Sequence, residues 1–297
     1  LVKELEPGLN ALFGLEYKRY ENQHAEIYVT ESSDRAFEEE VMLSGFANAQ
    51  VKAEGSGVSF DTAQETYTAR YTHDTVALAF AITEEAIEDN LYDRLASRYT
   101  KALARSMSNA KQVKAARPLI QGLPSTDNFD SGDAVSLFST NHTTISGTAV
   151  KNTLTTQADL NETSLEQALI DIAAMTDERG LRVAARAMKM IIPSANQFTA
   201  ERLMKSQGRT GTADNDINAV ASMGMVPQGY RVNNFLTDTD SWYLITDVPN
   251  GMKMFQRAAL KTAMEGDFDT GNVRYKARER YSFGVSDFRG IFGVEGA

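Results

Sequence analysis

Residues 69–118 read ARYTHDTVALAFAITEEAIEDNLYDRLASRYTKALARSMSNAKQVKAARP, and the apolar pattern changes its period part-way along. Through Phe80, apolar side chains alternate with polar or small ones, which predicts a β-strand. After Thr83, apolar or aromatic side chains recur every four residues, which predicts an α-helix over residues 83–117. At a rise of ~1.5 Å per residue this helix is about 50 Å long. We expect a helix of that length to act as a structural strut.

Both ends of the predicted helix carry local signals. Thr83 can cap the first turn, and Glu84 and Glu85 follow it near the positive end of the helix dipole. Lys114 and other basic residues crowd the far end, and Pro118 is expected to stop the helix.

The strand before the helix belongs to a predicted long hairpin, residues 41–80. Glycine and small residues interrupt the hairpin at its expected tip, which consists of Ala53, Glu54, Gly55, Ser56 and Gly57. A projecting two-stranded hairpin cannot bury both of its faces in its own small sheet. We therefore expect the tip to contact another subunit, which is the first indication of assembly.

The first 40 residues are polar and charged. Pro7-Gly8 is expected to break any early helix. An acidic run follows at Glu38, Glu39 and Glu40. Two interpretations stay open for this region: a solvated arm, or an extended arm that crosses a neighbouring subunit.

The second half of the chain predicts short helices and strands in alternation. A helix is expected over 163–180, with Thr163 and Glu166 as a capping box and Gly180 at its end. The other predicted elements are a strand at 188–193, a helix at 194–205, a β-rich start at 226–232 and strands at 242–248, 252–261 and 273–285.

The last strand alternates strictly between an apolar face and a basic face. The basic face consists of Arg274, Lys276, Arg278 and Arg280. Three interpretations stay open for it: a solvated outer sheet face, a contact with the acidic arm of a neighbour, or weak contact with packaged DNA through charge alone.

Composition excludes several classes of protein. The chain has 297 residues, 42% of them hydrophobic, which is enough for a sizeable core. The net charge of −10 argues against a protein that grips nucleic acid over its whole surface. No apolar run approaches the ~20 residues of a membrane span. The absence of cysteine excludes disulfides and thiol chemistry.

No motif indicates catalysis, a metal or a cofactor. Phosphate-binding loops, nucleophile elbows and paired metal-binding histidines are all missing from the sequence. The three histidines lie far apart, without a partner at metal-ligand spacing. One loop spaces three aspartates by three, which suits calcium only weakly, and a solvated acidic loop is the favoured interpretation. These residues are His24, His73 and His142, and Asp127, Asp130 and Asp133. We expect no catalytic, metal or cofactor site.

The order of these pieces resembles the major capsid proteins of tailed bacteriophages, which share the Hong Kong 97-like fold. A glycine-tipped hairpin runs into the opening of a long helix, AITEEAIED at residues 81–89. The segment LFSTNH at 137–142 is similar to one in Mu-like head subunits. Further similar segments are MIIP at 190–193 with its following helix, SWYLI at 241–245 and YSFGVSD at 281–287.

The resemblance implies an α+β fold and a division of the chain. The implied parts are an N-terminal arm (1–40), an extended loop (41–80), a peripheral domain with its spine helix (81–160), an axial domain (161–255) and return strands (256–297). It also implies a non-enzymatic subunit that assembles in the bacterial host cytoplasm, as pentamers and hexamers, into an icosahedral shell around double-stranded DNA. The implied partners are a scaffolding protein, a portal and a decoration protein, with weak non-specific contact to DNA. Lys52 lies near the loop tip, but no motif predicts the covalent cross-link that some members form.

Two alternatives of different kinds remain. An encapsulin shell has the same fold and packages an enzyme instead of a genome. A soluble α+β enzyme would show a polar cleft and a small oligomer. The spine helix and the two-lobed plan argue against a decoration or tail subunit.

Overall fold

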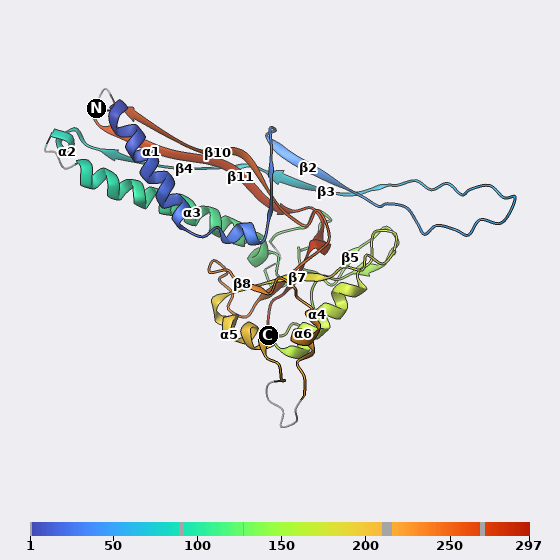
Figure 1. Cartoon of the computed structure of the whole chain (residues 1–297). Coiled ribbons are helices and arrows are strands. Elements are labelled where there is room, and N and C mark those ends of the chain that lie inside the picture. Colours follow the sequence, from blue (N-terminus) through green and yellow to red (C-terminus); the bar gives the residue numbers. More distant parts are fainter. Residues whose placement is uncertain (1, 89–91, 127, 210–215, 268–270) are drawn as a thin grey trace.

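The computed structural model describes residues 2–88, 92–126, 128–209, 216–267 and 271–297. It holds two four-stranded sheets and a separate hairpin. Figure 1 shows the long sheet and the hairpin's loop leaving the centre of the molecule in opposite directions, with the second sheet below. In the part of the chain that the structure describes, no helix is long and apolar enough to cross a membrane.

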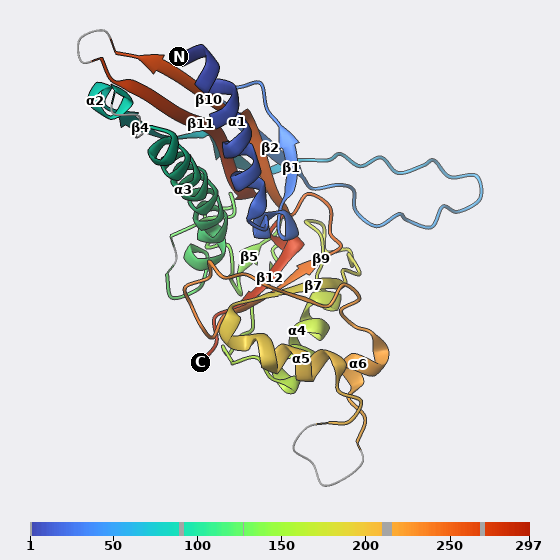
Figure 2. The ribbon, with the colours of Figure 1, turned by 60° about the vertical axis from the view of Figure 1, so that its left-hand side comes forward.

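The long sheet has the strand order β1-β10-β11-β4. Its strands are β1 (Val29–Ser32), β10 (Met252–Gly266), β11 (Val273–Val285) and β4 (Asp74–Ile82). β1 runs parallel to β10, and the other neighbours are antiparallel. Two helices, α1 (Val2–Arg19) and α3 (Tyr92–Gln121), pack against each other on one face of this sheet (Figure 2).

The helix α1 corrects the expectation for the N-terminus. Pro7-Gly8 does not break it, and residues 2–19 do not form an extended arm. Leu9 and Phe13 are one helical turn apart and buried, and Tyr17 continues this stripe. They belong to a hydrophobic cluster that α1 shares with α3 and the long sheet. Burial of such a stripe contributes about 1.5–3 kcal/mol per large side chain, enough to offset the hydrogen bond that a proline removes.

The predicted spine helix is present in two described pieces, α2 (Glu84–Glu88) and α3. Residues 89–91, between these pieces, lie outside the described residues. The prediction that Pro118 ends the helix is wrong, because α3 continues to Gln121. Leu119 is completely buried in the main core. Its burial favours another helical turn beyond the proline.

The second sheet has the order β12-β9-β7-β8. Its strands are β12 (Ile291–Val294), β9 (Trp242–Thr246), β7 (Ala187–Ile192) and β8 (Tyr230–Val232). Around it lie α4 (Glu162–Ala174), α5 (Gln197–Lys205) and α6 (Ala219–Met223). The remaining short elements are η1 (Gln23–Glu26), β5 (His142–Thr143), β6 (Ala149–Val150), η2 (Ser194–Asn196) and η3 (Phe288–Gly290).

The helix predicted at 163–180 is confirmed in position, but both of its end signals are wrong. Asn161 and Ser164, not Thr163 and Glu166, form the capping box. The helix stops at Ala174, and Gly180 instead occupies a left-handed turn with φ +82°.

The predicted hairpin is real but shorter than expected. β2 (Phe37–Leu43) pairs with β3 (Glu65–Thr72), and the chain then changes sheets at His73. The residues after it form β4, which pairs with β11 and not with the hairpin. His73 marks this change because its ring contacts Ser33 Oγ and Ser282 Oγ, both at 2.9 Å.

A buried ion pair joins the helix layer to the long sheet. Glu279 lies on the apolar face of β11, is completely buried, and accepts a hydrogen bond from Lys111 Nζ of α3 at 3.2 Å. The hydroxyl of Tyr17 in α1 donates to the other carboxylate oxygen at 3.4 Å. Three elements therefore meet on one carboxylate. Removal of one partner of a buried pair is costly because it leaves an uncompensated buried charge.

We predict that Lys111→Met lowers the free energy of unfolding by about 3–5 kcal/mol, because Glu279 then lacks its cation. Urea unfolding followed through Trp242, the only tryptophan, measures this change. Lys114→Met is the matched control on the same helix. Lys114 pairs with the mostly exposed Asp74, so the control should cost no more than about 1 kcal/mol. Equal losses in both variants would contradict the role given to Glu279.

A buried histidine gives the fold a predictable pH dependence. Gln112 of α3 accepts a hydrogen bond from the His24 main-chain N–H at 2.9 Å, and its amide nitrogen lies 3.0 Å from His24 Nδ1. Because an amide nitrogen can only donate, Nδ1 accepts and the ring is neutral. Burial, together with the nearby charge of Lys111, lowers the pKa of His24 to about 4.

The unfolded chain therefore binds a proton at His24 at a higher pH than the folded chain. Stability from the neutral ring is fully present above pH 6.5, the ordinary histidine pKa, and is lost as the pH falls toward about 4. We predict that His24→Asn removes a loss of roughly 3 kcal/mol between these values. Urea unfolding at several pH values tests this, and parallel pH profiles for the two proteins would contradict it.

Candidate functional site

The most exposed feature of the molecule is the loop between β2 and β3, residues 45–64, which we call the projecting loop. All of these residues are exposed. The main-chain N–H of Ser44 donates to the Gln64 carbonyl at its base, and Asp61 accepts from the N–H of Ala47. Beyond that base, residues 48–60 extend away from the body of the chain (Figure 1).

The predicted tip lies where the sequence indicated. Ser56 donates from both its main-chain N–H and its hydroxyl to the Ala53 carbonyl, which closes a turn at Glu54 and Gly55. Gly55 has φ +77°, a left-handed conformation that favours glycine. Gly57 follows the turn and is also exposed. That these tip residues contact another subunit stays a prediction.

The projecting loop carries apolar side chains in water. Val51 and Phe60 are 100% and 98% exposed, and Phe46 and Val58 are exposed to a lesser extent. Burial of apolar surface is favourable by roughly 25 cal/mol per Å². A segment with this composition favours contact with a partner over exposure to water.

The base of the hairpin is fixed to the segment that joins the two sheets. Tyr71 lies against Gly284, and its hydroxyl contacts Ser286 Oγ at 2.5 Å. Tyr67 donates to the Ser286 carbonyl at 3.4 Å. Gly132, with φ +96°, lets a second loop lie directly against β3. The rigid base therefore sets the direction in which the loop projects.

The acidic run lies on β2, at the edge of this base. Glu38 accepts from Ser33 Oγ at 2.7 Å, Glu39 lies 3.7 Å from Arg70, and Glu40 lies 2.6 Å from Lys253. Each carboxylate thus has a partner within its own chain. Burial alone would lower the pKa of Lys253, but the hydrogen bonds to Glu40 and Glu31 raise it. Contact of this run with a neighbouring subunit stays a prediction.

The basic row of β11 is present on the outer face of the long sheet. Arg274, Lys276 and Arg278 are exposed, and Arg280 is half-buried. Arg274 forms an ion pair with Asp267 in the same chain. The row faces away from α1 and α3, so a partner can reach it. The three interpretations of its function remain open.

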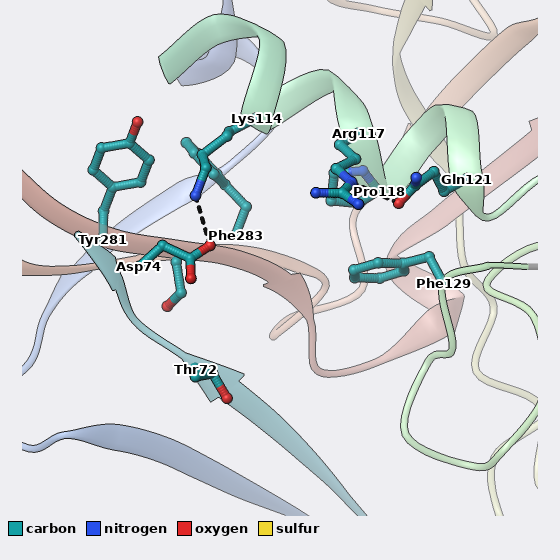
Figure 3. Close-up of a pocket in the computed structure, with 10 residues that line it drawn as sticks. Thr72, Asp74, Lys114, Arg117, Pro118, Gln121, Phe129, Tyr281 and Phe283 are labelled. Atoms are coloured by element: carbon teal, nitrogen blue, oxygen red, sulfur yellow. Dashed lines mark hydrogen bonds and ion pairs between the residues drawn. The ribbon is translucent and has the colours of Figure 1, made fainter. Parts of the chain in front are cut away.

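A pocket of about 280 Å³ lies between the end of α3 and the start of β4 (Figure 3). Lys114 and Asp74 form an ion pair at 2.6 Å on one side, and Arg117 Nε donates to Gln121 Oε1 at 2.8 Å on the other. Phe129 also lines the pocket. The pocket is thus lined by aromatic side chains, an ion pair and a hydrogen-bonded arginine.

One serine–histidine contact borders this pocket. Ser282 lines it and contacts His73 Nδ1, but the other ring nitrogen meets Ser33 instead of a carboxylate. A triad needs an acid that orients the histidine. Burial, and then the charge of Arg280, lowers the pKa of His73, which keeps the ring neutral. The contact therefore connects the strands and lacks the geometry of a catalytic triad.

The aspartate loop is a structural network. Asp133 contacts His142 Nδ1 at 2.6 Å, and His142 Nε2 lies 3.1 Å from Asn152 Oδ1. Burial would raise the pKa of Asp133, but hydrogen bonds from His142 and Ser131 lower it overall. Asp127 lies outside the described residues. Among the residues that are described, no three or more acidic or histidine side chains are grouped to hold a metal ion.

Comparison with known families decides the identity. The profile of a family described as "Phage capsid protein" matches residues 66–294, more than half of the chain. This chain belongs to the phage capsid protein family. The capsid protein is accordingly a structural protein of the virion, the major head subunit that assembles into the shell. The alternative of a compartment that packages an enzyme is not favoured.

Solved structures show the same fold over nearly the whole chain. A virus-like particle from Pyrococcus furiosus aligns with a TM-score of 0.56 at 9% identity, covering 97% of this chain and 98% of that chain. The capsid of an empty GTA particle gives 0.55 at 15% identity, with 92% and 89% covered. The capsid of Myoviridae phage XM1 gives 0.54 at 11% identity, with 91% and 90% covered.

These likenesses confirm the predicted α+β, Hong Kong 97-like fold of the capsid protein. No curated protein sequence matches the chain significantly. The structural likeness thus extends to chains that share only 9–15% of their residues with this one.

We predict that Gly284→Ala loosens the base of the projecting loop. A Cβ at this position would lie 2.5 Å from the ring of the buried Tyr71, so the ring must move away from Ser286. The expected cost is about 1–3 kcal/mol of unfolding free energy, with faster proteolysis of the hairpin. Gly266→Ala in β10, where a Cβ meets nothing within 4 Å, is the control and should cost little. Unchanged stability in Gly284→Ala would contradict the anchoring role.

Proposed function

We propose that the projecting loop of each capsid protein lies against the next copy in a ring, and that such rings are the pentamers and hexamers of an icosahedral shell. One observation carries this proposal: the loop extends apolar side chains into water, among them the fully exposed Val51. The loop and the long sheet point in opposite directions (Figure 1). A contact between two different surfaces, repeated from copy to copy, forms a closed ring when the rotation closes.

The two sheets correspond to the domains that the resemblance implies. We assign the long sheet with its helices to a peripheral domain and the second sheet to an axial domain near the ring centre. In this assignment the implied return strands, residues 256–297, divide between the two domains, because β10 and β11 lie in the long sheet and β12 lies in the second sheet. The buried core supports it, because the main cluster centres on the second sheet and a separate cluster lies under α1 and α3.

The shell encloses double-stranded DNA and assembles in the cytoplasm of the bacterial host. We propose that a scaffolding protein guides assembly, that a portal occupies one vertex and that a decoration protein can bind outside. The basic row of β11 is a surface for weak contact with DNA or with an acidic partner, and many copies together make such a contact effective. The capsid protein needs no catalytic residue for this function.

Deletion of residues 53–58 tests the role of the loop. We expect the full chain, expressed with a candidate scaffold, to form shells or pentamers and hexamers in negative-stain micrographs. The deletion variant should stay folded by circular dichroism. It should form about ten-fold fewer particles, because every subunit of a ring loses its loop contact with the next copy.

A length-matched control replaces the same six residues with Gly–Ser repeats. If this control assembles as the native chain does, the reach of the loop matters more than its tip residues. A stable monomer or dimer of the native chain under all conditions would contradict the proposed function.

A further inference from the structure

β4 forms a long open edge of the large sheet. The strand spans Asp74–Ile82 and pairs on one side with β11, in continuous register. Its sequence, DTVALAFAI, contains no lysine, arginine, proline or glycine. Every second residue therefore presents an unpaired N–H and C=O at a regular, flat edge. Natural proteins protect such edges with charges, prolines or bulges, because an open edge binds further strands.

The other edges of the two four-stranded sheets, in the described ranges, have that protection. β1 is four residues long, and β8 is three. β12 is completely buried. The free side of β10 has two register shifts and carries Lys261. Within the two four-stranded sheets, as far as their residues are described, β4 is thus the long and regular edge that stays unprotected.

A strip of apolar side chains runs beside this edge. Leu78 points toward the helix-covered face, yet it is 46% exposed, and Tyr99 of α3 is 44% exposed. Phe80 and Tyr99 pack with ring centroids 5.7 Å apart. A strand added to β4 would cover this strip with its own inward side chains, as well as pair with the open main chain.

The opposite face of β4 limits the charge of the added strand. There β4 presents only short side chains, including Ala77 and Ala79, next to the exposed Lys276 and Arg278 of β11. Outward side chains of an added strand would lie about two strand spacings, roughly 10 Å, from these cations. A neutral or acidic segment fits this position better than a basic one.

We propose that the edge of β4 binds residues 57–61 of a second copy's projecting loop as an added strand. This inference rests on the proposed function and names the surface that receives the loop. Val58 and Phe60 alternate with Gly57, Ser59 and Asp61, so one face of the segment is apolar and the other is polar. Asp61 lies at the end nearest the base of the loop, where its carboxylate also accepts from the N–H of Ala47. The apolar face covers Leu78 and Tyr99, and the polar face, which carries no cation, lies toward the basic row.

The other branch of the loop fits less well. It also exposes an apolar side chain, Val51, but it carries Lys52, which would lie close to the cations of β11. Within the described residues, the main-chain groups of residues 57–60 make no hydrogen bond to other main-chain groups. This segment therefore offers to the edge of β4 both the open main chain and the side-chain pattern that the edge requires.

Disulfide trapping tests the proposal directly, because the native chain contains no cysteine. Phe60→Cys is combined in turn with Val76→Cys, Leu78→Cys or Phe80→Cys, three positions on the same face of β4. Paired strands bring opposite side chains within disulfide distance, so one of the three pairs matches the register. Assembled particles are oxidised and analysed on non-reducing gels.

We expect one pair to give covalent dimers and higher species, about ten-fold more than two controls. In the first control Phe60→Cys is combined with Ala79→Cys, on the opposite face of β4. In the second, Val51→Cys is combined with Leu78→Cys, to probe the other branch of the loop.

Particles that form normally without trapping in any of the three pairs would overturn the inference and leave the proposed function intact. Equal trapping in the controls would also overturn it, because contact would then lack a defined face or branch. If no particle or ring forms from the native chain, both the inference and the proposed function fail.

Discussion

The carboxylate of Glu279 is the constraint on which the long sheet depends. It lies on the side of β11 that is otherwise apolar, where Lys111 of α3 and Tyr17 of α1 both reach it. An ionised group buried in this way is tolerated only with an opposite charge and hydrogen bonds around it. The pair therefore fixes where both helices cross the sheet. With the helices on one face, the basic row and the alanines are left on the other, and the edge of β4 stays open.

A second junction fixes the base of the projecting loop to the end of the long sheet. The chain leaves β11 through Gly284 and Ser286, which contact the two tyrosines of β3. Arg289 lies in η3, two residues before β12 of the second sheet. It is buried and contacts Glu178 at 2.7 Å and Asp287 at 3.2 Å. The short segment 284–289 thus connects the long sheet, the second sheet and the base of the hairpin. A rigid base with a long exposed loop is the arrangement expected of a subunit that reaches its neighbour.

The sequence predicted this fold well wherever one periodicity dominated. The alternation in β11 and the four-residue repeat in α3 were sufficient to place both elements, and glycine placed the turn at Gly55. It failed where a local signal competed with burial. Pro7 lies inside α1 and Pro118 inside α3, because apolar stripes that pack on the sheet outweigh the loss of one hydrogen bond.

The polar interior was harder to predict. Glu279 stands in the inward register of β11, between Ala277 and Tyr281, so a buried charge at that position could have been found from the alternation alone. Its partner Lys111 is 168 residues away in the chain, and nothing local connects the two. The surface proposed to receive the loop could not be predicted from the sequence either, because only the order of the strands shows that β4 is an edge.

The central claim is that each copy is held by the loop of its neighbour. A cryo-electron microscopy map of assembled particles, at a resolution that separates strands, tests it most directly. The account predicts that density for residues 45–64 of every subunit lies on the adjacent copy, with residues 57–61 along β4. Loops that fold back on their own subunit, or that extend into solvent while the shell stays closed, would contradict it.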